Sequence, residues 1–275
     1  MPFFSVIIPT YNRRALLTKA VDSVREQTYP DWELIIIDDG SNDGTGQLIA
    51  NYNDSRIRYT HQSNQGVSKA RNEGLKQAQG KYICFLDSDD WWNKDKLSIG
   101  YQYINQNPRY KIFHTQEIWY RGGKLLRQKN KHRKPHGSIF PACLPLCCVS
   151  ISTVLIHRSV FTRIGTFDEA LPACEDYDFW LRVCREYPVF LIDKPLTLKD
   201  GGRPDQLSQR IKGLDKYRIT ALVKLLNNKL PPGKEKNLVR EELRKKINIY
   251  AKGCVKRNRP REARDYLALL EKYAT

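Results

Sequence analysis

The sequence predicts an α/β fold with a mixed, mainly parallel sheet flanked by helices. Short runs rich in β-branched residues alternate with amphipathic helical patterns through the first hundred residues. Some of these runs, such as LIII at 34–37, are apolar throughout, so both faces of the strand must be covered. With 275 residues, 40% of them apolar, the chain is large enough to bury such a core.

The elements of the first part of the chain follow one another as strand and helix pairs. The expected pairs are 4–9 with 15–27, 32–38 with 44–51, 56–61 with 67–78, and 82–86 with 95–106. Further along, 144–156 has the composition of a strand, and 175–185 has the spacing of a helix. Residues 121–138 are polar and interrupted by glycine and proline, which predicts a basic loop.

The last part of the chain has a different character. After 231–233 (PPG) the apolar spacing is purely helical, and Pro260 stands where a second helix can begin. This pattern predicts an antiparallel helical hairpin near 234–273. We therefore expect a main domain over 1–205 and a C-terminal helical extension over 206–275.

Charge is distributed unevenly along the chain. Lys and Arg number 47 against 30 Asp and Glu, which gives a formal net charge of +17. The first 117 residues are balanced, whereas 118–167 contains nine basic and no acidic residues and 199–275 contains 21 basic and nine acidic residues. This excess predicts an anionic partner, such as a phosphate, a nucleotide, a nucleic acid or a lipid headgroup.

Targeting and cysteine patterns give an expectation for the compartment. The start MPFFSVIIP has no basic leader, and no run of about 18 uncharged apolar residues occurs. The seven cysteines lack the spacing of a disulfide framework. We expect a cytoplasmic protein that can contact the inner face of the membrane peripherally.

Polar and acidic residues directly follow three of the predicted strands. Thr10, Tyr11 and Asn12 follow the first strand, 38–41 (DDGS) the second, and 87–90 (DSDD) the fourth. Because the carboxyl ends of parallel strands meet at one edge of a sheet, these residues should converge. Several carboxylates on one rim repel one another unless a cation neutralises them, so the sequence predicts a divalent metal there.

Each motif taken alone also has a plainer interpretation. Asp-rich turns cap helices, and Asp90 and Asp95 are interpreted as caps or surface charges. Arg71, in GVSKARNEGL, can meet a phosphate or form a surface ion pair. Acids such as Glu175 and Asp176 are favoured in the first turn of a helix by the helix dipole.

The combination of motifs is far more specific than any one of them. They occur in the order SVIIPTYNR, LIIIDDGSNDGT, NQGVSKARNEGL, GKYICFLDSDD and GTFDEALPACEDYDFWLRV. Together they closely resemble the family 2 glycosyltransferases, which have the GT-A fold. The resemblance covers roughly residues 4–200 and does not extend to the terminal hairpin. It implies an inverting sugar transfer from a nucleotide-diphosphate sugar, usually assisted by Mg2+ or Mn2+.

The resemblance also implies roles for the donor-binding residues. Pro9, Thr10 and Tyr11 would line the nucleoside pocket. Asp39 would accept a hydrogen bond from the base, and Arg71 would lie near the nucleotide. A UDP-sugar is the expected donor.

The acidic pairs take the remaining roles in this resemblance. Asp87 matches the ribose-facing acid of the Asp-x-Asp motif and Asp89 the metal-binding acid, with Ser88 between them. Asp87 is a second candidate metal ligand. Asp176 corresponds to the catalytic base, and Glu175 to a positioning or acceptor-binding partner.

The chain departs from the family pattern at one position. Many members carry a further metal-binding His just before a segment ending in Gln-Leu-Ser, and GGRPDQLS places Arg203 there. Arg cannot ligate a cation, but its guanidinium binds phosphate in a bidentate manner. We predict that Arg203 contacts the donor diphosphate and that Asp89 is the principal protein ligand of the metal.

The expected acceptor is a hydroxyl of a glycan or a lipid-linked sugar in cell-surface polysaccharide or lipopolysaccharide assembly. The main alternative is a nucleic-acid or anionic-surface binding protein on a non-catalytic transferase-like fold, suggested by the +17 charge. The basic segments have no aromatic stacking motif and the acidic rim would repel a polyanion, so no nucleic acid is expected. A nucleotidyltransferase would carry a glycine-rich basic loop where this chain has 10–12 (TYN).

Overall fold

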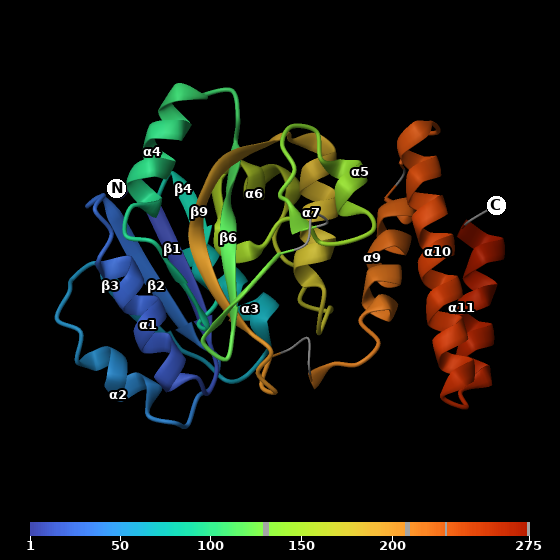
Figure 1. The fold of residues 1–275 in the computed structure, drawn as a ribbon, viewed down its shortest axis with the longest axis horizontal. Coiled ribbons are helices and arrows are strands. Elements are labelled where there is room, and N and C mark those ends of the chain that lie inside the picture. The colour runs from blue at the N-terminus through green and yellow to red at the C-terminus, as the bar shows by residue number, and fades with distance from the viewer. Residues whose placement is uncertain (129–131, 207–209, 229, 274–275) are drawn as a thin grey trace.

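The computed structural model describes residues 1–128, 132–206, 210–228 and 230–273. Within them, nine strands form one sheet in the order β3-β2-β1-β4-β8-β6-β9-β5, with β7 paired to β6 (Figure 1). The strands are β1 (Phe4–Thr10), β2 (Trp32–Asp38), β3 (Ile57–His61), β4 (Tyr82–Phe85), β5 (Asp90–Trp92), β6 (Ile112–Arg121), β7 (Lys124–Leu126), β8 (Val154–His157) and β9 (Val189–Gly201).

Helices cover both faces of this sheet. They are α1 (Arg14–Arg25), α2 (Thr45–Ala50), α3 (Val67–Gln77), α4 (Lys96–Gln106), α5 (Phe140–Cys143), α6 (Ser159–Ile164), α7 (Glu175–Glu186), α9 (Asp215–Asn227), α10 (Lys234–Lys256) and α11 (Pro260–Tyr273), with a short 3-10 helix η2 (Ile151–Thr153). Strands β1 to β4 run parallel to one another, whereas β8 is antiparallel to β4 and β6. The predicted α/β class with a mixed, mainly parallel sheet and flanking helices is confirmed.

The central strands have the burial that their composition predicts. All seven residues of β1 and all seven of β2 are buried. Side chains alternate between the faces of a strand, so Val6 and Ile8 pack with Leu17 in one core, while Ile7 packs with Ala70 in the other. The helices on the two faces therefore enclose two separate apolar layers around one sheet.

Several parts of the chain differ from the predicted elements, among them β5 and β6, which were not predicted. The segment 144–156 contains a strand only at its end, where β8 begins at Val154, because η2 and a loop come first. Strand β9 was not among the predicted elements, and it contains Pro195, which lacks the N–H that a sheet needs. Pro195 lies opposite Gln116, where the register of β6 and β9 shifts, so the irregularity accommodates it. Residues 124–126 of the predicted basic loop form β7 on the edge of β6.

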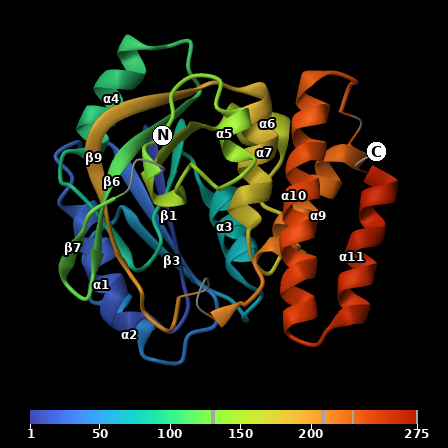
Figure 2. The same ribbon diagram turned by 45° about the vertical axis from the view of Figure 1, so that its right-hand side comes forward.

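The C-terminal helices stand together beside the sheet domain (Figures 1 and 2). Helix α9 packs against α7 and against α10, and α10 packs along α11. Leu222 of α9 and Val239 of α10 belong to the same apolar cluster as Trp180 of α7. No helix in the described ranges is long and apolar enough to cross a membrane. The domain boundary between 205 and 206 stays a prediction.

Candidate active site

The carboxyl ends of the first, second and fourth strands meet at one edge of the sheet. Thr10 lies opposite Asp38, and the backbone N–H of Asp39 donates to the carbonyl of Thr10 at 2.9 Å. The N–H of Leu86 donates to the carbonyl of Ile7 at 3.0 Å, which places Asp87 at the same edge. The predicted convergence of the polar residues that follow these strands is confirmed.

A buried arginine joins three elements at this edge. Arg71 of α3 donates through Nη1 to Oε1 of Glu175 at 2.5 Å and through Nη2 to Oδ1 of Asp87 at 2.9 Å. Arg71 is only 4% exposed, so a single guanidinium links α3, the end of β4 and the start of α7 from inside the protein. We call Arg71, Asp87 and Glu175 the Arg71 cluster.

The two carboxylates of the Arg71 cluster differ in their electrostatics. Burial would raise the pKa of Asp87, but the positive charges of Arg71 and Lys199 outweigh it and hold that pKa below its usual value. Burial raises the pKa of Glu175, and the neighbouring charge of Asp176 adds to the rise, although Arg71 opposes it. The cluster therefore keeps Asp87 ionised at the edge that faces the nucleotide in the family resemblance.

The second acid of the Asp-x-Asp motif is held by side chains from distant parts of the chain. Oδ2 of Asp89 lies 3.2 Å from Nη1 of Arg13 and 3.2 Å from Nε2 of Gln206, and it also accepts a hydrogen bond from Arg203. Both arginines in turn pair with Asp205. We call Asp89, Arg13, Arg203, Asp205 and Gln206 the Asp89 cluster. In this structure Arg203 donates a hydrogen bond to Asp89. Its contact with a donor diphosphate stays a prediction.

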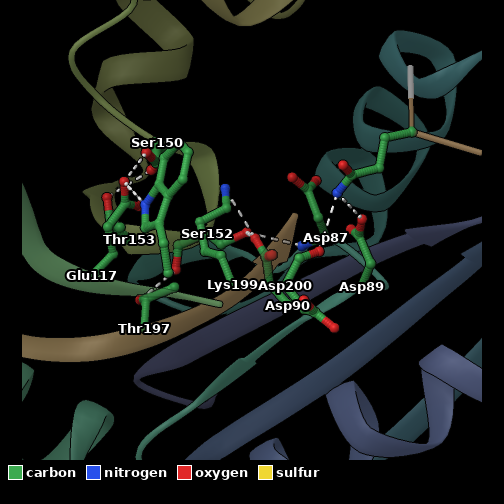
Figure 3. A network of polar contacts seen from close by, with 12 residues as sticks. Asp87, Asp89, Asp90, Glu117, Ser150, Ser152, Thr153, Thr197, Lys199 and Asp200 are labelled. Carbon is green, nitrogen blue, oxygen red and sulfur yellow. Dashed lines mark hydrogen bonds and ion pairs between the residues drawn. The ribbon is translucent and has the colours of Figure 1, made fainter. Parts of the chain in front are cut away.

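The network continues from Asp89 and Asp87 into the protein, as Figure 3 shows. Oδ2 of Asp90 lies 3.1 Å from Nζ of Lys199 and accepts a hydrogen bond from Oγ of Ser152 at 2.7 Å. Ser152 also accepts the backbone N–H of Asp87 at 3.1 Å. Asp90 is 3% exposed and begins β5 opposite Lys199, so its interpretation as a cap or surface charge is wrong.

Lys199 stays charged in this setting. Burial alone would lower its pKa, but the carboxylates of Asp90 and Glu117 outweigh burial and raise it above the usual value. The half-buried ammonium of Lys199 therefore pairs with the buried Asp90 directly behind the Asp-x-Asp motif. Ser152 donates to Asp90 and accepts the N–H of Asp87. The buried side chains of Ser152 and Asp90 therefore hold the Asp-x-Asp motif in place.

The predicted nucleoside-binding residues lie around the ends of β1 and β2. Pro9 and Thr10 are buried within or at the end of β1, Tyr11 is 43% exposed, and Ser88 is buried between the two acids of the motif. A surface hollow of about 620 Å³ opens beside Arg13 and is lined also by Asn12, Arg14, Asp43 and Asp205. Open volume thus lies next to the Asp89 cluster.

Asp39 is tied to the start of α3. Its carboxylate accepts hydrogen bonds from Nε2 of Gln62 at 2.7 Å, from the N–H of Gln65 at 2.9 Å and from the N–H of Gly66 at 2.7 Å. Gly66, with φ of +91°, immediately precedes α3, which carries Arg71. The carboxylate of Asp39, which the sequence assigns to the nucleotide base, therefore also fixes the loop from which α3 begins.

The Glu-Asp pair at the start of α7 divides into a buried and a half-buried residue. Glu175 is 5% exposed and faces Arg71, whereas Asp176 is half-buried. Oδ1 of Asp176 accepts the N–H of Tyr177 at 2.7 Å, and the thiol of Cys147 lies 3.5 Å from Oδ2. The preceding Cys174 has φ of +60°, a left-handed conformation that is uncommon outside glycine and turns the chain into the helix.

The acids present suit a hard cation that the donor would help to bind. The contacts of Asp89 are made through Oδ2 and the contact of Asp87 with Arg71 through Oδ1, so Oδ1 of Asp89 and Oδ2 of Asp87 can accept other partners. Among the described residues no group of three or more metal-binding side chains occurs. Mg2+ is commonly held by one or two carboxylates together with substrate phosphates and water, and this donor set fits that mode.

Several residues of the site were not identified from the sequence. Arg13, Lys199, Ser152 and Gln206 all belong to the network, and only Arg13 carried a signal, because it directly follows the polar residues after β1. Its partner Asp89 is far away in the sequence. The two residues meet because β1 and β4, which precede them, lie side by side in the sheet.

The fold indicates the structural class of the protein, and the sequence matches then indicate its family. The fold is that of the GT-A glycosyltransferases. It superposes on S. aureus TarS 1–349 in complex with UDP-GlcNAc with a TM-score of 0.72 and 24% identity, covering 87% of this chain and 71% of that chain. It also superposes on the mannosyltransferase PcManGT from Pyrobaculum calidifontis in complex with GDP-Man and Mn2+, with a TM-score of 0.65 and 17% identity, over 100% of this chain and 76% of that chain.

The chain belongs to glycosyltransferase family 2. The family model "Glycosyl transferase family 2" matches residues 5–164, and "Glycosyltransferase like family 2" matches residues 122–217. The recognition of the family from the sequence motifs is confirmed.

Two relatives show how far the similarity extends. An uncharacterised glycosyltransferase of Rickettsia felis is 36% identical over 200 residues, which is 70% of this chain but 32% of that protein. The chain thus matches about a third of the length of that relative. The Escherichia coli UDP-Glc:alpha-D-GlcNAc-diphosphoundecaprenol beta-1,3-glucosyltransferase WfgD is 31% identical over 190 residues, covering 69% of this chain and 72% of that protein.

Proposed function

We propose that this family 2 glycosyltransferase moves a sugar from a UDP-sugar to a hydroxyl of a glycan or lipid-linked acceptor, with inversion at the anomeric carbon. The Arg71 cluster carries the proposal, because it brings the first acid of the Asp-x-Asp motif and the Glu-Asp pair of α7 onto one buried guanidinium. The name of WfgD supports a UDP-sugar donor and a diphosphate-lipid acceptor, and the UDP-GlcNAc complex of TarS supports a nucleotide-sugar donor. Cell-surface polysaccharide or lipopolysaccharide assembly is the corresponding setting.

Donor binding would use the edge at the ends of β1, β2 and β4. Pro9, Thr10 and Tyr11 would line the nucleoside pocket, and Asp39 would accept a hydrogen bond from the base. Asp39 has two carboxylate oxygens with spare acceptor capacity beyond the three hydrogen bonds that hold α3. Asp87, ionised through its contact with Arg71, would accept from a ribose hydroxyl.

The diphosphate would lie against the Asp89 cluster. Asp89, with Asp87 as a second ligand, would hold Mg2+ or Mn2+, whose chemistry is to stabilise the negative charge that grows on the leaving diphosphate. Arg203 is 23% exposed and lies next to Asp89, so its guanidinium is within reach of the same phosphates. Arg13 contacts the same carboxylate oxygen of Asp89 and keeps the carboxylate at the edge of the sheet.

The transfer itself needs a base on the acceptor side. Asp176 is the half-buried acid at the start of α7, and it would take the proton of the acceptor hydroxyl as that oxygen bonds to the anomeric carbon and the bond to the diphosphate breaks. Glu175 would position this turn through its hydrogen bond with Arg71. One contact therefore couples the acceptor side to the ribose side of the site.

A thermal-shift panel tests the proposal. UDP, GDP, dTDP and CMP and their sugar conjugates are added to the wild type and to Asp89→Ala, each with and without Mn2+. A ligand at about 100 times its dissociation constant adds about 2.7 kcal/mol of stability, so binding is visible. A shift by UDP or a UDP-sugar that needs Mn2+ and is lost in Asp89→Ala supports the donor class and the role of Asp89. The absence of a shift with every nucleotide would contradict the proposal.

A further inference from the structure

The outward face of α10 is basic and carries an exposed aliphatic side chain. Lys245, Ile249, Lys252 and Lys256 follow one another at helical spacing and all are exposed, with Ile249 at 62%. Lys246, one position further on than Lys245, instead faces inward and pairs with Glu242. Within the described part of the chain, the three outward lysines form no ion pair. The face therefore presents unneutralised positive charge around an apolar centre.

The turn between α10 and α11 extends this surface. Val255 is 61% exposed, and Arg257, Arg259 and Arg261 are exposed beside it. Arg259 is the one of these that pairs with an acid in the described residues, Glu262 at 2.9 Å. The sequence from 243 to 261 contains no Asp or Glu, so no acidic residue interrupts the charge along the second half of α10 and its turn.

A second exposed tip has the same composition. Strand β7, directly after the β6–β7 turn, carries Leu125, 66% exposed, and Leu126, 40% exposed, flanked by the exposed residues Arg121, Lys124 and Arg127. Aliphatic side chains flanked by arginine and lysine are typical of surfaces that insert into the headgroup region of a bilayer.

Both tips lie in the same half of the molecule. In Figures 1 and 2 the α10–α11 turn and the β6–β7 turn both lie in the lower half of the molecule, where β9 also ends, and Figure 2 shows them on opposite sides of it. The Asp89 cluster lies beyond the end of β9, because Arg203 and Gln206 follow Gly201 closely. The half of the protein with the basic, partly apolar tips is therefore also the half that carries the candidate site.

We propose that the outward face of α10 and the α10–α11 turn dock the protein on an anionic lipid bilayer, with the β6–β7 turn as a second contact. Each lysine or arginine near an anionic membrane strengthens binding about fivefold, and exposed aliphatic side chains add a salt-resistant part. A nucleic acid would pair with the positive charges, but its phosphate backbone would not bury the exposed aliphatic side chains of Ile249, Val255, Leu125 and Leu126. The proposal does not depend on the catalytic function, since it concerns only the surface.

Co-sedimentation with vesicles tests the docking surface. The vesicles are phosphatidylethanolamine with or without phosphatidylglycerol, at low and high salt. The triple variant Lys245→Gln, Lys252→Gln, Lys256→Gln removes three exposed charges that have no described partner, so the fold should be kept. We expect the wild type to bind only the anionic vesicles and the triple variant to bind about a hundredfold more weakly. The double variant Ile249→Ser, Val255→Ser should still bind the anionic vesicles at low salt. The salt concentration that releases it should be lower than the one that releases the wild type.

A charge-matched control separates a docking surface from the overall net charge. Lys94→Gln, Arg109→Gln, Lys194→Gln removes the same charge from exposed positions of the sheet domain and should bind as the wild type does. Circular dichroism and the unfolding temperature establish that each variant is folded. Equal weakening in the two triple variants, equal binding to neutral vesicles, or no binding by the wild type at low salt would overturn the proposal. Tighter binding of the wild type to duplex DNA or RNA than to anionic vesicles would also overturn it.

Discussion

The Arg71 cluster and the Asp89 cluster are both built from arginines and carboxylates, yet they are held by different kinds of backbone. Arg71 lies inside a helix, and its partners stand at the end of a strand and at the start of α7, so three regular elements fix one buried guanidinium. Arg13 precedes α1, while Arg203, Asp205 and Gln206 belong to the segment after β9, and their side chains are partly exposed. Burial of Arg71 and Glu175 makes the first set rigid although Asp87 is 29% exposed, whereas solvent screens the arginines of the second set.

The difference indicates a division of labour. The Arg71 cluster fixes Glu175, and with it the turn that carries Asp176, in one arrangement, as catalysis requires of a base and its support. The Asp89 cluster pairs a candidate metal ligand with two arginines that solvent can reach, so these contacts can exchange for a cation and a diphosphate at modest cost. The same comparison gives predictions about turnover, stability and acid sensitivity.

The largest expected effect is on turnover, at Asp176, which directly follows Glu175 of the Arg71 cluster. Asp176→Asn keeps the size and the hydrogen-bond acceptor but removes the proton acceptor, and kcat should fall about a thousandfold. Steady-state kinetics with the donor identified by the thermal-shift panel measure this change. Asp265→Asn, at an exposed position of α11, is the matched control and should have wild-type kcat. A fall of less than about tenfold in Asp176→Asn would remove Asp176 as the base.

The two clusters should also differ in what they contribute to folding. Arg71→Leu leaves Asp87 and Glu175 without their buried partner and should lower the free energy of unfolding by about 3 kcal/mol or more. Arg203→Leu breaks a partly exposed pair that Arg13 and Gln206 still back up, so the loss should be under about 1 kcal/mol. Urea unfolding of both variants gives the comparison. Similar losses would show that the Asp89 cluster is as rigid as the Arg71 cluster.

A buried histidine outside both clusters gives a reference for acid sensitivity. Burial, helped by the charge of Lys134, lowers the pKa of His114 to about 3, against 6.5 when exposed. The unfolded chain therefore takes up a proton first, and the stability present above pH 6.5 is lost as the pH falls toward 3. Between pH 6.5 and 5 the loss is about 2 kcal/mol.

Replacing His114 should remove this loss while leaving the carboxylate clusters in place. His114→Gln can still donate a hydrogen bond to the carbonyl of Pro135, the partner of Nε2 at 2.8 Å. Urea unfolding at pH 7 and pH 5 should show a smaller drop in the variant than in the wild type. An identical drop would place the acid sensitivity in the carboxylates.

A smaller effect than that of Arg71→Leu is expected at the serine behind the motif. Ser152→Ala leaves the N–H of Asp87 without its acceptor and Asp90 with Lys199 alone. The free energy of unfolding should fall by about 1 kcal/mol. Because the Asp-x-Asp turn loses its support, KM for the donor should rise while kcat changes little. A fall in kcat at unchanged KM would indicate that Ser152 acts on the chemistry instead.

The sequence predicted those parts of the fold whose signals are local. The apolar runs of β1 and β2 and the helical spacing of α3 and α7 depend on neighbouring residues, and they were identified. Strand β9 was not predicted, and the shifted register with β6 shows how its Pro195, which lacks an N–H, fits in the sheet. Residues 144–156 were taken as a strand from composition, whereas only the end at Val154 pairs with neighbours.

The candidate site divides in the same way. Asp87, Asp89, Glu175 and Asp176 lie in motifs that the sequence shows directly. The partners that set their charge come from far away, since Arg71 is 104 residues from Glu175 and Arg203 is 114 residues from Asp89. Asp90 was interpreted as a cap because nothing near it reveals that Lys199 pairs with it across β5 and β9. Such pairings follow from topology, which a single sequence does not display.

The central claim is that Asp176, on the turn that Glu175 positions through Arg71, carries the chemistry, and that Asp89 holds the metal through which the donor diphosphate binds. Calorimetric titration of UDP in the presence of Mn2+ into wild type, Asp176→Asn and Asp89→Asn tests it directly. The account predicts that Asp176→Asn binds UDP as tightly as the wild type and that Asp89→Asn loses the Mn2+-dependent part of the affinity. Unchanged Mn2+-dependent binding in Asp89→Asn, together with weakened binding in Asp176→Asn, would contradict it.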